Sequence, residues 1–227
     1  MKPKQQKLQR LNLPGMGTQL TNLTADYCVV DLETTGLHAT WDHIIEIGAM
    51  RIREGRKVAE FSTLVQPPER YPNWYVNQYI TKLTGISNAM LAEAPKPAEA
   101  LPAFLHFLGS DVIVGYNVGF DVDFLAFQCQ KVLQKVLPND YVDALPLAQL
   151  LLTELERHRL VDVSQALQVV NPNAHRALSD VETTWKCYEK LKKIALQQYA
   201  AEQEVSAALR KAMKLPEEKV EEQLSLF

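Results

Sequence analysis

Residues 27–33 of the chain read YCVVDLE, and the triplet TTG follows at 34–36. The apolar, β-branched run predicts a buried strand, and the glycine marks its end. Two more strands are predicted by IIEIGAMRI at 44–52, which alternates strongly, and by VAEFSTLVQP at 58–67. The ordered part of the chain therefore begins with three successive strands.

Helical and strand patterns alternate after these strands. Helices are predicted at 76–83, 97–108, 120–137 and from 175 to about 214. Short strands are predicted at 112–117 and 141–142. This order predicts an α/β fold in which helices pack on a central sheet.

The length and composition indicate one globular domain with appendages. The chain has 227 residues, of which 47% are hydrophobic and 22% are charged. No apolar run approaches the ~20 residues that a membrane span needs, and no apolar segment follows MKPKQQKLQR at the start, so we expect a cytoplasmic protein. Three widely spaced cysteines, at 28, 129 and 187, lack the spacing of a zinc site and are expected to be buried thiols.

The charge distribution limits how nucleic acid could be bound. The net charge is −3, but Lys2, Lys4, Lys7 and Arg10 lie in the first ten residues, so the rest of the chain carries −7. A broad basic groove for duplex DNA is therefore not indicated. A local site in which metal ions supply positive charge is the alternative.

Two carboxylates lie two residues apart at the end of the first strand. Asp31 and Glu33 emerge on the same side of a strand and can reach one ion together. Thr34, Thr35 and Gly36 follow and offer hydroxyl and backbone donors nearby. Solvated acids at a strand end are the plainer interpretation of this pair.

A second candidate group is GYNVGFD at 115–121, where an apolar strand runs into a helix. Asp121 lies at this junction, and open α/β sheets bind ligands at such strand ends. The alternative is that Asp121 caps the helix, which is a frequent use of aspartate.

A third candidate group is HRALSD at 175–180, at the start of the last helical region. His175 would lie at the helix entry and Asp180 one turn inside, so the imidazole could swing over a site that Asp180 lines. A surface histidine beside an arginine is the alternative.

Taken in order, DLETTG at 31–36, YNVGFDVDFL at 116–125 and HRALSD at 175–180 resemble the three exonuclease motifs of the DEDD superfamily, in its histidine-containing subtype. Bacterial proofreading subunits such as DNA polymerase III epsilon belong to this family. The resemblance spans roughly residues 26 to 192 and includes weaker matches at 44–50, 80–87 and 141–151. One departure is Tyr116, where the family usually has histidine before the asparagine.

The resemblance implies a ribonuclease H-like fold with a mixed sheet of about five strands flanked by helices. It also implies that four carboxylates hold two Mg²⁺ or Mn²⁺ ions and that His175 is the general base; the carboxylates are Asp31, Glu33, Asp121 and Asp180. The terminal nucleotide would be gripped around Thr34, Thr35, Gly36 and Leu37, with Asn117. Phe120 could stack on a base, but a core position is the favoured interpretation.

These residue types suit phosphodiester hydrolysis. Two ions ~4 Å apart can activate water, stabilise charge on the phosphoryl oxygens and assist the departing 3′ oxygen. Hard oxygen ligands favour Mg²⁺ or Mn²⁺ over zinc. A histidine can accept the proton of the attacking water near neutral pH. Without metal, the clustered carboxylates should repel one another and retain protons.

The expected organisation has four parts. They are a flexible basic arm at 1–22, an exonuclease domain at 23–194, a helical extension at 195–215 and a flexible tail at 216–227. The tail ends in Gln223, Leu224, Ser225, Leu226 and Phe227, which resemble the pentapeptide that docks on the bacterial sliding clamp. Alternatively, the apolar residues of the tail fold back on the chain's own helices.

Three functions fit these patterns. The first is a 3′→5′ exonuclease of replication or repair, acting on single-stranded or frayed DNA 3′ ends, tethered to the clamp and associated with a polymerase subunit. The second is an exoribonuclease with the same site, since only contacts to the 2′-OH would distinguish the sugar. The third is a non-catalytic clamp-bound adaptor, against which the intact set of candidate residues argues.

Overall fold

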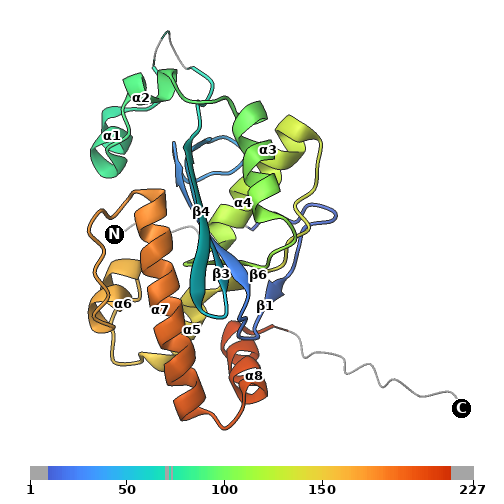
Figure 1. The fold of residues 1–227 in the computed structure, drawn as a ribbon, viewed down its shortest axis with the longest axis vertical. Coiled ribbons are helices and arrows are strands. Elements are labelled where there is room, and N and C mark those ends of the chain that lie inside the picture. Colours follow the sequence, from blue (N-terminus) through green and yellow to red (C-terminus); the bar gives the residue numbers. More distant parts are fainter. Residues whose placement is uncertain (1–9, 70–71, 73, 216–227) are drawn as a thin grey trace, which may run out of the picture.

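A six-stranded sheet forms the centre of the fold (Figure 1). The structure is a computed structural model that describes residues 10–69, 72 and 74–215. The strand order is β1-β6-β5-β2-β3-β4. The strands are β1 (Gln19–Leu20), β2 (Tyr27–Thr34), β3 (Ile44–Arg53), β4 (Arg56–Leu64), β5 (Ile113–Gly115) and β6 (Tyr141–Asp143). β2, β3 and β4 pair antiparallel, whereas β5 runs parallel to β2 and β6, and β1 runs parallel to β6. The predicted α/β class with a mixed sheet is confirmed.

Helices cover both faces of this sheet (Figure 1). The helical segments are α1 (Gln78–Thr84), α2 (Asn88–Ala92), α3 (Pro97–Leu108), α4 (Gly119–Gln128), a π-helical turn (Cys129–Leu133), α5 (Ala144–Leu151), α6 (Leu160–Ala166), α7 (Ala177–Gln198) and α8 (Glu202–Met213). α5, α7 and α8 contribute to the core on one face, and α3 and α4 to the core on the other. Within the described residues, no helix is both long and apolar enough to cross a membrane.

The alternation of side chains along β2 decides which residues face α7. Tyr27 and Val29 belong to the core shared with α7, whereas Cys28 and Val30 belong to the core shared with α3 and α4. Because side chains alternate along a strand, Asp31 and Glu33 continue the face of Tyr27 and Val29. The two carboxylates therefore lie on the α7 side of the sheet.

Residues 10–22 differ from the predicted flexible arm. Gln19 and Leu20 pair with Tyr141 and Val142 as an edge strand, which explains why the sheet has six strands and not about five. Upstream, the Arg10 guanidinium donates to Asp123 at 2.8 Å. Strand pairing and the Arg10–Asp123 ion pair thus attach this segment to the domain, while residues 1–9 lie outside the described residues.

Two predicted helices are divided in the structure. The helix expected at 120–137 ends as α4 at Gln128 and continues only as the π-helical turn. The helical region from 175 to about 214 consists of α7 and α8, separated at Tyr199, where the backbone is extended. Val205 and Leu209 of α8 are buried in the same core as α7, so α8 packs on this domain. The three cysteines are buried free thiols, as expected.

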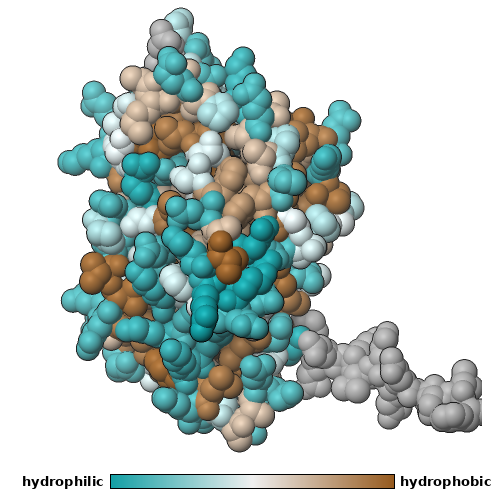
Figure 2. All heavy atoms as spheres, in the orientation of Figure 1, coloured by the Kyte–Doolittle hydropathy of each residue, from teal (hydrophilic) through white to brown (hydrophobic). Residues whose placement is uncertain are grey.

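The surface is largely hydrophilic on the face seen in Figure 2, and apolar residues are more frequent in its upper half. The upper end of the molecule in Figure 1 carries α1 and α2. Their exposed apolar side chains are Tyr79, Leu83 and Met90. Exposed apolar residues therefore occur on the two short helices between β4 and α3.

Candidate active site

The end of β2 brings the first two candidate carboxylates toward the start of α7. In the antiparallel pairing with β3, Asp31 lies opposite Gly48 and Glu33 lies opposite Glu46. A register shift between Glu33 and Thr34 ends this regular pairing. Asp31 is half-buried and Glu33 is buried.

The first turn of α7 rests directly on the backbone of β3. A Cβ added at Gly48 would lie 2.5 Å from the carbonyl carbon of Ala177, so glycine is what permits this close approach. The contact places the residues that flank Ala177 over β2. Side-chain atoms of Glu33, His175 and Asp180 that could bind a metal ion lie within 4.8 Å of one another.

Asp121, from a distant segment of the sequence, also contacts β2. It lies in the first turn of α4 and is 4% exposed, and its Oδ1 accepts a hydrogen bond of 3.0 Å from the backbone N–H of Leu32. The N-cap of α4 is Val118, so Asp121 is not the helix cap that was the alternative interpretation. This bond places Asp121 beside Asp31.

Burial and neighbouring negative charges raise the pKa values of the candidate carboxyl groups. Burial raises the pKa of Asp31 well above its usual value, and the charges of Asp121, Asp180 and Glu33 add to the effect. Burial also raises the pKa of Glu33 to about 8, with contributions from Asp180 and Glu46 that the Arg176 charge opposes. This agrees with the expectation that the carboxylates retain protons without metal.

The other two carboxyl groups follow the same pattern. Burial raises the pKa of Asp121, although hydrogen bonds from its own backbone N–H and that of Leu32 oppose the rise. Burial raises the pKa of Asp180 as well, against hydrogen bonds from Asn171 and His175. Several buried carboxyl oxygens with uncompensated negative charge form an environment that suits a divalent cation.

His175 lies at the entry to α7 with an exposed side chain and a positive φ of 64°. Its backbone N–H donates to Oδ2 of Asp180 at 2.9 Å, and the Asn171 side-chain amide donates to Oδ1 at 2.6 Å. Each oxygen of Asp180 thus accepts one hydrogen bond and keeps a lone pair for a cation.

Glu46, Arg176 and Asn171 were not identified as site residues from the sequence. Glu46 accepts hydrogen bonds from the Arg176 guanidinium and from the backbone N–H of Ala177. A signal was present in IIEIGAMRI, where Glu46 occupies the same strand face as the buried Met50 and Ile52. A charged residue on the buried face of a strand needs a partner, and this would have identified it.

The turn before α4 shows what the Tyr116 departure does. The Tyr116 hydroxyl donates to the backbone carbonyl of His158 at 2.6 Å, which joins this turn to the segment between α5 and α6. Asn117 has a positive φ of 58°, and its backbone N–H donates to Asp143 at 2.8 Å. Tyr116 therefore braces the turn through a contact outside the carboxylate cluster.

The segment after β2 is held by short-range hydrogen bonds. The Thr34 hydroxyl donates to the Gly36 carbonyl at 2.6 Å, and the Thr35 hydroxyl accepts from the backbone N–H of His43 at 3.0 Å. Leu37 is 64% exposed. Phe120 is partly buried against Phe124, with ring centroids 4.7 Å apart, as its core interpretation expects.

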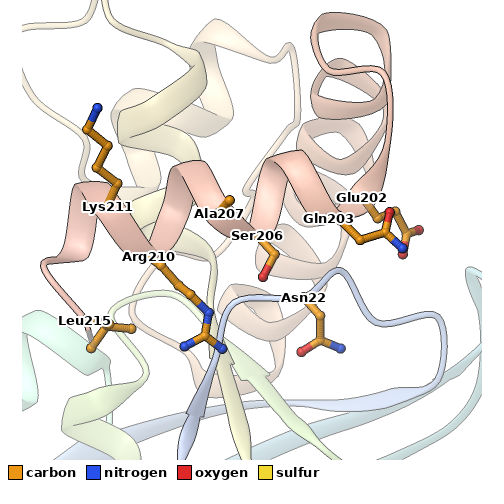
Figure 3. Close-up of a pocket in the computed structure, with 8 residues that line it drawn as sticks. All are labelled: Asn22, Glu202, Gln203, Ser206, Ala207, Arg210, Lys211 and Leu215. Atoms are coloured by element: carbon orange, nitrogen blue, oxygen red, sulfur yellow. The ribbon is translucent and has the colours of Figure 1, made fainter. Parts of the chain in front are cut away.

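A cavity of about 840 Å³ lies elsewhere, beside α8 and the segment before β2 (Figure 3). Its lining residues are Asn22, Glu202, Gln203, Ser206, Ala207, Arg210, Lys211 and Leu215. None of the candidate site residues that the structure describes lines it. The residues predicted to bind the clamp lie outside the described residues, so their role stays a prediction; they are Gln223, Leu224, Ser225, Leu226 and Phe227.

Comparison with known proteins agrees with the architecture and the motifs. The family model described as Exonuclease, of the RNase T type, matches residues 28–188. The chain is 32% identical over 169 residues to the DNA polymerase III subunit epsilon of Aquifex aeolicus, covering 74% of this chain and 81% of that protein. The chain belongs to this exonuclease family.

Larger relatives and solved structures share the same unit. The chain is 35% identical over 176 residues to the DNA polymerase III PolC-type of Latilactobacillus sakei, covering 78% of this chain but only 12% of that relative. Exonuclease I of E. coli in complex with a dT13 oligonucleotide superposes with a TM-score of 0.64 at 21% identity over 78% of this chain and 43% of that one. Exonuclease X in complex with 5′ overhanging duplex DNA superposes with a TM-score of 0.57 at 21% identity, over 80% of this chain and 98% of that one. These two structures share the fold.

Proposed function

We propose that the chain is a divalent-metal-dependent 3′→5′ exonuclease that releases nucleoside monophosphates from DNA 3′ ends. One observation carries the proposal: three segments far apart in the sequence bring four carboxylates and a histidine to one end of β2. The raised pKa values of the four carboxyl groups, caused by burial and by neighbouring negative charges, describe a site in need of positive charge.

Asp31, Glu33, Asp121 and Asp180 would hold two metal ions. When bound, the ions supply an activated water and stabilise the charge of the phosphoryl oxygens and the departing 3′ oxygen. A zinc ion bound form is described for the complex of E. coli exonuclease I with single-stranded DNA, which has this fold. In the present chain the predominance of carboxylate oxygens favours Mg²⁺ or Mn²⁺.

His175 would act as the general base. Its exposed imidazole lies in the same group as Glu33 and Asp180, so it can approach a water near the scissile phosphate and accept its proton. Asp180 would also help to position His175, because it accepts a hydrogen bond from the backbone N–H of that residue. Thr34, Thr35, Gly36, Leu37 and Asn117 would contact the terminal nucleotide.

The named relatives favour DNA as the substrate. They are DNA polymerase III proteins, and the solved structures of this fold include complexes with DNA. The exoribonuclease alternative keeps the same site and differs in contacts to the 2′-OH. Retention of all five site residues argues against the non-catalytic adaptor.

Association with a polymerase and with the sliding clamp belongs to the same proposal. The relatives' names place them in DNA polymerase III, and the QLSLF ending resembles a clamp-binding peptide. A protein with this role would work in the bacterial cytoplasm. Deleting residues 223–227 should abolish binding to a purified clamp while leaving cleavage of a short oligonucleotide unchanged; retained clamp binding would refute the assignment of the tail.

The activity can be tested with labelled oligonucleotides. The purified chain should shorten DNA from its 3′ end in single-nucleotide steps with Mg²⁺ or Mn²⁺ and not with EDTA, on matched and on mismatched ends. Asp31→Ala and His175→Ala should remove the ladder, and RNA of the same sequence should be cleaved more slowly. Faster cleavage of RNA would favour the exoribonuclease, and no cleavage of either polymer with either metal would contradict the enzymatic proposal.

A further inference from the structure

Glu46 is a charged residue in the interior of the protein. It lies on β3 and is 2% exposed. Both of its oxygens accept from the Arg176 Nε at 3.2 Å, and Oε1 also accepts from the Arg176 Nη2 at 2.7 Å. Oε2 accepts from the backbone N–H of Ala177 at 3.0 Å. A buried carboxylate is tolerated when it is paired and hydrogen-bonded in this way.

Glu46 lies between β2, which carries Glu33, and α7, which carries Asp180. Glu46 lies directly opposite Glu33 in the β2–β3 pairing. Two residues along the same face, Gly48 allows the backbone of Ala177 to approach β3. β3 therefore contacts the start of α7 at two positions: Glu46 forms an ion pair and hydrogen bonds with it, and Gly48 allows its backbone to pack closely.

His175 adopts a conformation that needs support from its surroundings. Its φ of 64° is unfavourable for a residue with a side chain. On one side it is bonded through its own N–H to Asp180, and on the other its neighbour Arg176 is tied to Glu46. These contacts fix the backbone on both sides of the histidine.

We infer that Glu46 and Arg176 are positioning residues that hold His175 beside Glu33 and Asp180 for the reaction. The inference rests on the proposed exonuclease function, in which His175 is the base. Neither residue needs to touch substrate or metal. They act by setting where the imidazole can go, which is a role that residues behind a metal site often have.

A purely structural role makes a different prediction. If the Glu46–Arg176 pair only stabilised the fold, its loss would lower the melting temperature and leave the turnover of the folded enzyme unchanged. A positioning role lowers kcat more than it changes KM, because binding of the DNA strand does not require the imidazole.

The experiment compares four variants with the wild-type chain: Arg176→Gln, Arg176→Lys, Glu46→Gln and the double variant Glu46→Gln/Arg176→Gln. Lys186→Gln is the matched control, because Lys186 and Glu182 form an exposed ion pair on the same helix. For each chain, kcat and KM on a single-stranded oligonucleotide, the melting temperature and hydrogen exchange of the His175 amide by NMR are measured.

Arg176→Gln and Glu46→Gln should lower kcat by about 10- to 100-fold, in the range seen when partners of site residues are removed. KM should stay within about threefold of wild type. Arg176→Lys should recover part of kcat, because it keeps the charge but not the paired donors. The double variant should be no worse than the poorer single variant, since both changes break one unit.

The His175 amide provides a readout that does not depend on activity. Its hydrogen bond to Asp180 should protect it from exchange in the wild type and in Lys186→Gln, and exchange should become at least about tenfold faster in Arg176→Gln and Glu46→Gln. Unchanged kcat and unchanged exchange in folded variants would overturn the inference. If the wild type itself cleaves nothing, the proposed function fails, and the exchange measurement still decides whether the pair positions His175.

Discussion

The backbone N–H of Leu32 donates a hydrogen bond of 3.0 Å to Oδ1 of Asp121, a residue 89 positions away in the sequence. This bond places the carboxylate of the second motif against the strand that carries the first. Asp31 and Asp121 are consequently neighbours in a site where burial raises the pKa values of both; the charge of Asp121 adds to the rise at Asp31, and the charges of Asp143 and Glu33 add to the rise at Asp121.

Asp121→Asn separates the electrostatic and catalytic roles of this carboxyl group. The amide oxygen can still accept from Leu32, while a buried carboxyl group that must either hold a proton or carry a charge is removed. In EDTA at pH 8 we expect the free energy of unfolding to rise by on the order of 1 kcal/mol. Exonuclease activity should fall by at least about two orders of magnitude, because metal stabilises the transition state by several kcal/mol.

Urea denaturation and the oligonucleotide assay measure these two effects on one preparation. Lys186→Gln is a control for changes of charge outside the site. A variant that is both fully active and unchanged in stability would show that Asp121 is neither a metal ligand nor a repulsive neighbour.

The stability of the metal-free chain should decrease as pH rises. The pKa of Glu33 is raised to about 8, and those of Asp31, Asp121 and Asp180 are raised too, so between about pH 4 and pH 8 the folded state binds more protons than the unfolded state. In that window the slope of the unfolding free energy with pH is negative. Between pH 6 and pH 8 we expect a loss on the order of 2 kcal/mol.

Thermal melts in EDTA and in Mg²⁺ test this dependence. Saturating Mg²⁺ should raise the melting temperature most at pH 8, since the ion binds the deprotonated carboxylates and stabilises the folded state by about 2.7 kcal/mol at 100 times its Kd. Glu33→Gln should flatten the pH dependence in EDTA. A metal-free stability that increases from pH 6 to pH 8 would contradict the assignment.

Tyr116→Phe should affect stability and spare catalysis. The change removes the hydroxyl that donates to the carbonyl of His158, at a cost of about 1 kcal/mol in the free energy of unfolding. Because that bond joins Tyr116 to His158 and to none of the candidate carboxylates, kcat should remain within about twofold of wild type. Denaturation and steady-state kinetics measure the two quantities, and a tenfold loss of kcat would show that Tyr116 takes a direct part in the site.

Gly48→Ala should displace the first turn of α7. The new methyl group would lie 2.5 Å from a backbone atom of Ala177, so helix and strand must move apart. Overpacking of this kind costs about 1–3 kcal/mol, and kcat should fall because His175 and Asp180 move with the helix. Gly85→Ala is the control for a glycine replacement that causes no crowding: a Cβ there meets no atom within 4 Å, and its φ of 75° adds only local backbone strain. Equal kcat for Gly48→Ala and wild type would show that the spacing of α7 and β3 does not matter for turnover.

Much of this protein was determined by local sequence. The β-branched run at 27–33 and the alternation at 44–52 predicted β2 and β3, and the helical period of 97–108 predicted α3. The three motifs identified Asp31, Glu33, Asp121, His175 and Asp180 as candidates. These features could be predicted because strand and helix periodicities are properties of neighbouring residues. The family resemblance depends on short ordered motifs in the same way.

Only the tertiary structure decided which residues support those candidates. Glu46 and Arg176 are 130 positions apart, and nothing in either segment specifies the other until β3 and α7 are packed together. Arg10 and residues 19–20 are polar or weakly patterned, yet they attach to Asp123 and to β6. Their places depend on burial and on backbone donors left free at a sheet edge, which arise only when distant parts of the chain come into contact.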